Sequence, residues 1–237
     1  MQVSEIGLDS PLLDVVYDEL LVPNFPDHEL LTPASLRAGL KAGVLWISAV
    51  VRDGRPDGIA IAEWSPRSRV LLLAYMAVRR DLRSSGIGRT LMAEIHTGWQ
   101  DRVHPLLTLA EVEHPAAHTP DGEHGDQSAR LRFYARHGAR VLDVPYFQPS
   151  LRPGAPRVPG MVLVLLATAP ELAGADVLPS APVREYMTEY FEENEGTVPD
   201  DPATTALFAA MPPGGIPLLP IDDVAALPCT RDVTPDV

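Results

Sequence analysis

The stretch Arg83-Ser84-Ser85-Gly86-Ile87-Gly88 decides how the rest of the chain is interpreted. An apolar run that ends at Val78 precedes it, and a pattern typical of a helix follows over 89–99. A strand, a glycine turn and a helix N-terminus in this order gather unpartnered backbone N–H groups where the helix dipole favours an anion. Gly86 and Gly88 have no Cβ, so these N–H groups can approach a phosphate closely. The stretch therefore predicts a pyrophosphate site.

Two familiar phosphate motifs do not fit this stretch. Leu91 stands where the dinucleotide fingerprint has its third glycine, and no Gly-Lys-Ser/Thr follows for a P-loop. The pattern that fits is Q/R-x-x-G-x-G/A, with Arg83 at its first position. By itself this short pattern is also compatible with a purely structural turn, so its interpretation depends on the surrounding chain.

Length and composition favour one domain, or one domain with an extension, in a chain of 237 residues of which 46% are hydrophobic. Cys229 is the only cysteine, which excludes an internal disulfide framework and a cysteine zinc cluster. No apolar run approaches the roughly 18 residues of a membrane span, and the N-terminus lacks a signal pattern. We therefore expect a cytoplasmic protein without a membrane partner.

The negative charge is concentrated at the end of the chain. Residues 169–237 hold 13 acidic residues and two arginines, out of a net charge of −13 for the whole sequence. Because no basic face is evident, we expect no nucleic-acid partner. The same segment contains eleven prolines, which argues against a second compact core. We expect one helix over 182–193, packed either on its own core or on a second subunit of a homodimer, and irregular chain after Pro212.

Hydrophobic periodicity in residues 1–168 predicts an alternation of helices and strands. The expected helices cover 11–21, 32–43, 88–99 and 127–137, and the expected strands cover 1–6, 44–52, 58–64, 70–78, 106–113, 141–147 and 161–167. This order predicts an α/β (α+β) fold with a mixed central sheet of six to seven strands flanked by helices. The predicted domains are a core over 1–168 and an acidic, proline-rich extension over 169–237.

Three motifs together resemble one family. The stretch 83–88 is similar to the coenzyme A loop of the GCN5-related N-acetyltransferases (GNAT). Residues 132–139, Arg-Phe-Tyr-Ala-Arg-His-Gly-Ala, resemble the family's F/L-Y-x-x-x-G-F helix, with Ala139 in place of the aromatic. Glu111-Val112-Glu113 resembles the E-V-x strand of ribosomal-protein acetyltransferases. The resemblance covers residues 1–168 and implies the GNAT fold with acetyl-CoA, or another acyl-CoA, as cosubstrate.

The resemblance also implies which residues hold the donor. The backbone of Ala77 and Val78 would pair with the pantetheine arm, and Gln127 stands where the family has a pantetheine-binding asparagine. The pyrophosphate would be held by the backbone of Arg83, Ser84, Ser85, Gly86, Ile87, Gly88 and Arg89. Arg79 and Arg80 either meet the 3′-phosphate or are exposed surface arginines.

Acyl transfer to an amine needs a base for the amine proton and an acid for the departing thiolate. The resemblance makes Tyr134 the acid, because family members place a tyrosine there beside the sulfur; the alternative is a tyrosine packed in the core. Glu111 is the first choice for the base, directly or through a water. Strand alternation puts Glu113 on the same face, where like charges would raise one pKa, although either glutamate could simply face solvent. Leu72 occupies the base position of histone-acetylating relatives, which argues against that site.

Three histidines, His114, His118 and His124, raise the question of a metal. They lie in a Gly/Pro-rich loop, without the spacing of a metal motif, so we interpret them as solvated loop histidines and expect no metal cofactor.

The sequence therefore predicts an acyl-CoA-dependent N-acyltransferase that acetylates a small-molecule amine within a ternary complex. The loops 114–126 and 149–159 are expected to shape the acceptor pocket, because variable loops usually carry specificity. One alternative is a catalytically silent acyl-CoA-binding or regulatory domain. Another is a donor whose pantetheine belongs to a carrier protein.

Overall fold

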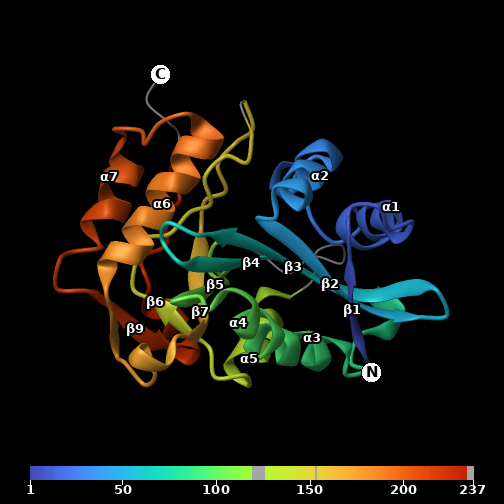
Figure 1. Ribbon diagram of the computed structural model, residues 1–237. Helices are drawn as coiled ribbons and strands as arrows, with labels where there is room; N and C mark the ends of the chain where they lie inside the picture. Colours follow the sequence, from blue (N-terminus) through green and yellow to red (C-terminus); the bar gives the residue numbers. More distant parts are fainter. Residues whose placement is uncertain (119–125, 153, 234–237) are drawn as a thin grey trace. The chain divides into compact units, whose positions relative to one another are not determined.

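The structure, a computed structural model, describes residues 1–118, 126–152 and 154–233 (Figure 1). They form two compact units, which we describe separately. Unit 1 consists of residues 1–64 and 71–105, and unit 2 of residues 65–70 and the described residues from 106 onward. None of the helices in these ranges combines the length and apolar composition that crossing a membrane requires.

Unit 1 contains the first four strands in the order β1-β2-β3-β4. Its strands are β1 (Val3–Ile6), β2 (Leu45–Arg52), β3 (Arg55–Ser65) and β4 (Val70–Val78). Its helices are α1 (Leu12–Val16), which continues as a π-helical turn over Tyr17–Leu21, then α2 (Pro33–Ala42), α3 (Ile87–His96) and α4 (Gly98–Val103). Both β1 and β3 pair antiparallel with β2. Short 3₁₀ turns cover Asp27–Glu29 and Arg80–Leu82.

Local sequence signals account for these elements. The Oγ1 atom of Thr32 accepts a hydrogen bond from the N–H of Ser35 at 3.1 Å and caps α2, Pro33 follows at the first helical position, and Gly43 ends the helix in the left-handed region. The apolar faces of α1 and α2 pack with the strands in one core, in which Val16, Leu36 and Ile47 are fully buried. The predicted helix 88–99 is divided at Thr97 into α3 and α4.

Unit 2 contains five strands in the order β5-β7-β6-β9-β8, and each neighbouring pair is antiparallel. The strands are β5 (Leu107–Glu113), β6 (Arg140–Leu142), β7 (Met161–Thr168), β8 (Val177–Leu178) and β9 (Ile216–Pro220). The helices are α5 (Gln127–Ala135), α6 (Ser180–Glu195) and α7 (Pro202–Ala209). Two 3₁₀ segments cover Pro170–Leu172 and Ile221–Ala226.

Two expectations about the end of the chain are wrong. The described residues form nine strands rather than six to seven, four in unit 1 and five in unit 2, and the chain after Pro212 is not irregular. Strand β9 pairs with β6, where Val141 lies opposite Leu219. The prolines of this segment argued against a compact fold, but Pro217 and Pro220 are exposed in β9 while Ile216 and Leu218 are buried. The strand therefore keeps its apolar face despite its prolines.

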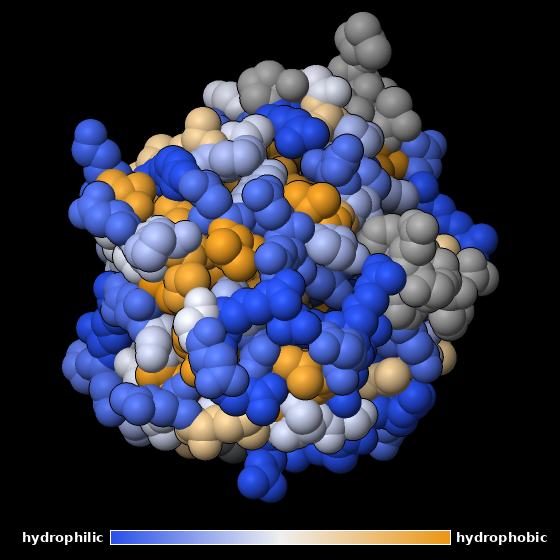
Figure 2. All heavy atoms as spheres, turned by 90° about the vertical axis from the view of Figure 1, so that its right-hand side faces the viewer, coloured by the Kyte–Doolittle hydropathy of each residue, from blue (hydrophilic) through white to orange (hydrophobic). Residues whose placement is uncertain are grey.

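The predicted helix 182–193 is present as the longer α6. Its apolar residues Val183, Met187 and Phe191 are fully buried, and the ring of Phe191 lies 5.9 Å from that of Phe147 and 6.2 Å from that of Phe208. The apolar face of α6 is therefore covered by its own chain. In the view of Figure 2 hydrophobic residues appear between hydrophilic ones on the surface, and the exposed large hydrophobic residues include Val22 and Val177.

The predicted strand 141–147 is too long, because β6 ends at Leu142. The chain then turns, and residues 146–148 are buried as a single segment: Tyr146 and Phe147 completely, Gln148 to all but 7%. The apolar run that suggested a strand is thus a buried connection.

Candidate active site

The loop between β4 and α3 has the backbone geometry of an anion site. The 3₁₀ turn Arg80–Leu82 leads into Ser84 and Gly86, which have positive φ angles of 67° and 89°. Gly86 caps α3 without any side-chain hydrogen bond, and the first backbone bond of the helix joins the N–H of Thr90 to the carbonyl of Gly86 at 3.1 Å. Because glycine has no Cβ, Gly86 adopts its φ of 89° without the steric cost that other residues meet, which explains the glycine at this position of the motif.

Three N–H groups at the start of α3, those of Ile87, Gly88 and Arg89, precede the first helical donor. Within the described part of unit 1 they make no hydrogen bond, and the preceding residues Ser84 to Gly86 are exposed. Backbone donors left unpaired at the positive end of a helix suit phosphate oxygens. These residues therefore fit the diphosphate of a coenzyme A ester.

A glycine of β3, Gly58, allows α3 to begin where it does. A Cβ atom at this position would lie 2.6 Å from Cγ2 of Ile87 and 3.1 Å from the carbonyl oxygen of Ala77. Ile87 is fully buried, so the first turn of α3 rests directly on the glycine. Sequence reasoning missed this residue, although a glycine inside a strand signals a close approach of another segment.

The arginines around the loop differ in their roles. Arg79 forms ion pairs with the buried Asp57 at 3.6 Å and with Asp81 at 2.9 Å, so it is a structural residue rather than an exposed surface arginine. Arg80 and Arg83 donate to the preceding loop, to the carbonyl of Pro23 at 2.8 Å and to Oδ1 of Asn24 at 3.1 Å. Arg89 is exposed on the first turn of α3. Three of these four arginines therefore hold the loop in place through bonds within the protein.

The end of β4 carries the two residues expected to meet pantetheine. Ala77 is buried and Val78 half-buried, and the N–H of Arg79 donates to the carbonyl of Asp57 at 2.9 Å. Backbone pairing between β3 and β4 thus continues to the start of the loop. Farther back, the Tyr75 hydroxyl donates to the carbonyl of Glu29 and accepts from the N–H of Leu31, each at 2.9 Å, so Tyr75 ties β4 to the segment before α2.

In unit 2, the carboxylate of Glu111 on β5 accepts two side-chain hydrogen bonds. The Tyr146 hydroxyl donates to Oε1, and the amide Nε2 of Gln148 donates to Oε2 at 2.8 Å. Burial raises the pKa of Glu111, and the two hydrogen bonds oppose that rise. A fixed carboxylate with a raised pKa is suited to accept a proton from an amine. The role of Gln148 was not expected from the sequence, where no local pattern marks it.

Glu113, two residues farther along β5, has a different set of partners. Its Oε2 accepts from Nε2 of Gln127 at 2.9 Å and lies 3.5 Å from Nη1 of Arg130, while its Oε1 lies 3.6 Å from Nδ1 of His118. We expected repulsion between the two glutamates to raise the pKa of one of them. The pKa of Glu111 is raised, but the cause is its burial and not Glu113. The two carboxylates are held by separate groups of residues.

Gln127 is almost completely buried at the start of α5, where the Oδ1 atom of Asp126 caps the helix by accepting from the N–H of Ala129 at 3.0 Å. Because its Nε2 donates to Glu113, its Oε1 points elsewhere, and this buried oxygen has no hydrogen-bond partner among the described residues. An unpartnered buried acceptor costs free energy until a donor arrives. The residue thus fits an amide N–H, the group that a pantetheine arm would offer.

Tyr134 lies on the buried side of α5, with its ring 5.5 Å from that of Phe133 in an edge-to-face arrangement. Burial raises the pKa of its hydroxyl above the ordinary value, and Arg130 opposes the rise. The phenol therefore keeps its proton near neutral pH, as an acid must. The packing fits the core interpretation equally well, so its role stays a prediction.

The loop histidines are not simply solvated. His114 is buried; its Nδ1 accepts from the N–H of Ala116 and its Nε2 lies 3.0 Å from the carbonyl of Val224, so the ring is neutral with its proton on Nε2. His118 lies 3.0 Å from the carbonyl of Pro159. His124 falls outside the described residues, and the described ones contain no group of three or more His, Cys, Asp or Glu that could hold a metal ion.

The architecture and the loop define a class. A β-strand, a glycine turn and a helix in unit 1, together with the strand and helix that carry Glu111 and Tyr134 in unit 2, give the chain the fold of the GNAT acetyltransferases. The similar solved structures include a protein assigned to the GNAT family of acetyltransferases in Bacteroides thetaiotaomicron. It shares 19% sequence identity, with a TM-score of 0.58, and the match covers 80% of this chain and 98% of the other.

Two further solved structures are similar at lower scores. The ribosomal-protein-S18-alanine N-acetyltransferase of Escherichia coli has 15% identity and a TM-score of 0.48, covering 74% of this chain and 99% of its own. A GNAT family acetyltransferase of Elizabethkingia anophelis with acetyl-CoA bound has 14% identity and a TM-score of 0.47, covering 70% and 96%. No family model and no curated protein matches the sequence.

Proposed function

We propose that the protein is an acyl-CoA-dependent N-acyltransferase that acetylates a small-molecule amine. The observation that carries the proposal is the start of α3, where three backbone N–H groups without a partner in the described part of unit 1 follow a glycine in the left-handed region. These donors would hold the diphosphate of acetyl-CoA. Gln127 would accept a hydrogen bond from the pantetheine arm, and the end of β4, Ala77 and Val78, would pair with its backbone-like amides.

The bound cosubstrate supplies an acetyl thioester, and residues of this chain would accept and donate the protons that the transfer requires. Glu111 takes a proton from the acceptor ammonium, directly or through a water, so that the amine lone pair can attack the thioester carbon. The C–N bond forms and the C–S bond breaks within one ternary complex. Tyr134 donates its proton to the departing thiolate sulfur, and the second proton that the nitrogen loses as the amide forms restores the Tyr134 hydroxyl. Glu113 keeps Gln127 in place rather than sharing the proton of Glu111.

Two alternatives use the same loop. A catalytically silent acyl-CoA-binding domain would need the N–H groups of α3 but not Glu111. A carrier-protein donor would offer a pantetheine arm without the adenosine diphosphate, and would not depend on the diphosphate-binding N–H groups. Two side chains from a distant segment donate hydrogen bonds to the carboxylate of Glu111 and fix its orientation. This arrangement favours a catalytic protein over a silent one.

Calorimetric titration with acetyl-CoA tests the proposal. The full-length protein should bind with a Kd in the micromolar range, and Gly86→Glu should abolish binding because it adds bulk and negative charge where the diphosphate lies. Gly174→Glu is the matched control: it has a similar φ of 75°, with nothing within 4 Å of its added Cβ, and it is remote from the loop in sequence. Binding that survives Gly86→Glu, or that is absent from the folded parent protein, would contradict the proposed donor.

A further inference from the structure

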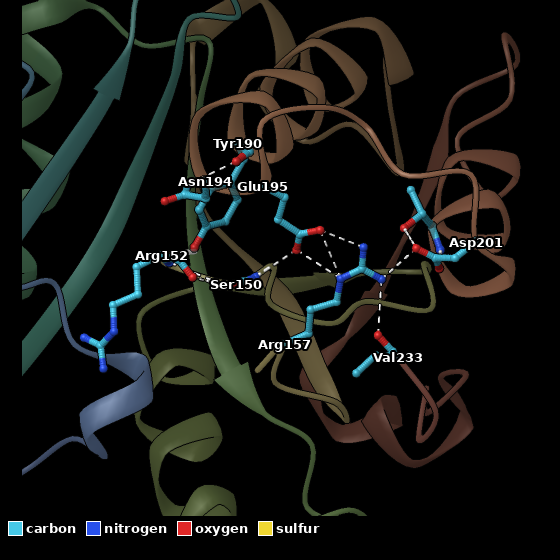
Figure 3. A network of polar contacts seen from close by, with 9 residues as sticks. Ser150, Arg152, Arg157, Tyr190, Asn194, Glu195, Asp201 and Val233 are labelled. Atoms are coloured by element: carbon cyan, nitrogen blue, oxygen red, sulfur yellow. Dashed lines mark hydrogen bonds and ion pairs between the residues drawn. The ribbon is translucent and has the colours of Figure 1, made fainter. Parts of the chain in front are cut away.

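A buried arginine, Arg157, forms the centre of a polar network in unit 2 (Figure 3). Its side chain is only 1% exposed. The carboxylate of Glu195 accepts from Nε at 3.0 Å and from Nη2 at 2.8 Å, and Asp201 accepts from Nη1 at 2.8 Å. The carbonyl of Val233 accepts from the same Nη1 at 3.2 Å. The guanidinium is thus fixed by the end of α6, the start of α7 and the chain after β9.

The same guanidinium lies over the ring of Phe147, with its carbon atom 5.1 Å from the ring centroid, and over Phe191 at 5.6 Å. Such a contact between a buried cation and aromatic rings is favourable. Phe147 stands between the two residues that donate to Glu111, Tyr146 and Gln148. Fixing the ring of Phe147 therefore fixes the backbone from which both donors extend.

A second connection runs through the backbone. Val158, next to Arg157, pairs with Gln148 in an antiparallel bridge whose two N–H···O bonds measure 3.0 and 2.9 Å. Glu195 also accepts from the N–H of Ser150 at 3.0 Å. One carboxylate therefore binds both Ser150, which follows Gln148, and Arg157, which precedes Val158.

Simple stabilisation would not require this network. Burying a charge is costly, and apolar side chains of similar volume often stabilise a core as well as a buried ion pair does. Buried, fully paired ionic groups do define one arrangement of the segments that they join. Here the segment defined in this way is the one that supplies the partners of Glu111.

We propose that Arg157 is a positioning residue for the proposed acyl transfer. Together with Glu195 and Asp201 it fixes the bridge between Gln148 and Val158, and through it the orientation in which Tyr146 and Gln148 hold the carboxylate of Glu111. This inference rests on the proposed function for its catalytic consequence. It gives Glu195, Asp201 and Val233 a supporting role in the proposed site, although they lie beyond residues 1–168, over which the sequence motifs resemble the acetyltransferases.

The test uses full-length Arg157→Met and Arg157→Lys. Arg140→Met is the matched control, because Arg140 also pairs with a carboxylate in unit 2, Asp176 at 2.9 Å, and donates to backbone carbonyls, but contacts neither Phe147 nor Glu195. Two properties are measured: amide hydrogen exchange at Gln148 and Val158, and steady-state kinetics with acetyl-CoA and an accepted amine.

In Arg157→Met, exchange at Gln148 and Val158 should be faster by about tenfold or more, because the bridge opens more easily. The kcat should fall about tenfold with the KM for acetyl-CoA unchanged, and Arg157→Met should add nothing further in a Glu111→Gln background. Arg157→Lys should recover part of the loss. Arg140→Met should leave exchange at the bridge unchanged.

Exchange at the bridge that is unchanged in a folded Arg157→Met protein would overturn the inference, as would a kinetic loss that adds fully to that of Glu111→Gln. If Arg157→Met does not fold, Glu195→Gln replaces it, since Asp201 still pairs with the arginine, and the same two results decide. Failure of the proposed function would instead appear as absent turnover in the parent protein, while the exchange measurement still decides whether Arg157 fixes the bridge.

Discussion

Two regions of the molecule meet their hydrogen-bonding needs in opposite ways. The loop before α3 is exposed, and it presents three backbone N–H groups that bond to nothing within the described part of unit 1. Glu111 in unit 2 is half-buried, and two side chains from a separate segment already donate to its carboxylate. One region presents unpaired backbone donors, and the other a carboxylate whose partners are already in place.

The difference follows from access to water. An exposed N–H group is satisfied by solvent, so it can stay unpaired in the protein at little cost until an anion replaces the water. A carboxylate with restricted access to water has fewer such substitutes and relies more on protein donors to remain ionised. A site made of backbone should therefore respond to changes in backbone shape, and a site made of buried side chains should respond to the loss of a single functional group.

The largest expected effect is that of Glu111→Gln. The amide retains the shape of the carboxylate but cannot take the amine proton, so turnover should fall by about 10² to 10⁴-fold. Calorimetry should give an unchanged Kd for acetyl-CoA, because the loop in unit 1 is untouched.

Glu113→Gln is the matched control for this substitution, on the same strand and two residues away. Its carboxylate holds Gln127 rather than accepting the amine proton, so it should raise the Kd for acetyl-CoA with a smaller loss of turnover. Equal losses of turnover in the two variants would contradict the separate roles of the glutamates.

The difference between a backbone site and a site of distant side chains also explains which features could be predicted from the sequence. The loop could be predicted because its determinants are consecutive: a strand, glycines that permit a positive φ, and a helix start within a few residues. The cap of α2 by Thr32 and the end of that helix at Gly43 were predictable for the same reason. Local backbone chemistry leaves a local pattern.

The partners of Glu111 leave no such pattern. Tyr146 and Gln148 follow it by 35 and 37 residues, and only the packing of the turn after β6 brings them to β5. Arg157, in a proline-rich loop, could not be distinguished from a surface arginine before the positions of Glu195 and Asp201 were known. Strand β9 was missed because its prolines outweighed the alternation of buried and exposed residues.

We expect a smaller effect from Gly58→Ala, which tests whether the loop before α3 depends on the shape of its backbone. The added methyl group would meet Cγ2 of Ile87 at 2.6 Å and the Ala77 carbonyl at 3.1 Å, so the first turn of α3 must move. We expect the free energy of unfolding to fall by about 1–3 kcal/mol and the Kd for acetyl-CoA to rise about tenfold.

Gly7→Ala in the same unit is the control, because an added Cβ there meets no atom within 4 Å. Denaturant unfolding and calorimetry on both variants separate the two effects. If Gly58→Ala loses stability but binds acetyl-CoA like the parent protein, the placement of α3 is not what forms the anion site.

The smallest effect that we expect is on the pH dependence of stability, through His114 in unit 2. Burial lowers the pKa of His114, with the neighbouring charges of His118 and Arg231 acting in the same direction, while the bond to the Val224 carbonyl opposes the shift. The unfolded chain therefore takes up a proton near the ordinary histidine pKa of about 6.5, before the folded protein does. Above that pH both states are neutral at this residue. Below it, the free energy of unfolding should decrease as pH falls, until the folded-state pKa is reached.

His114→Gln should remove this contribution while its amide can still donate to the carbonyl of Val224. The slope of unfolding free energy against pH should become shallower by at most about 1.4 kcal/mol per pH unit, measured by denaturant unfolding between pH 7 and the onset of carboxylate titration. His28→Gln in unit 1, where the histidine side chain is 43% exposed, controls for the loss of an imidazole as such. An unchanged slope in His114→Gln would show that the buried ring accepts a proton as readily in the folded protein as in the unfolded chain.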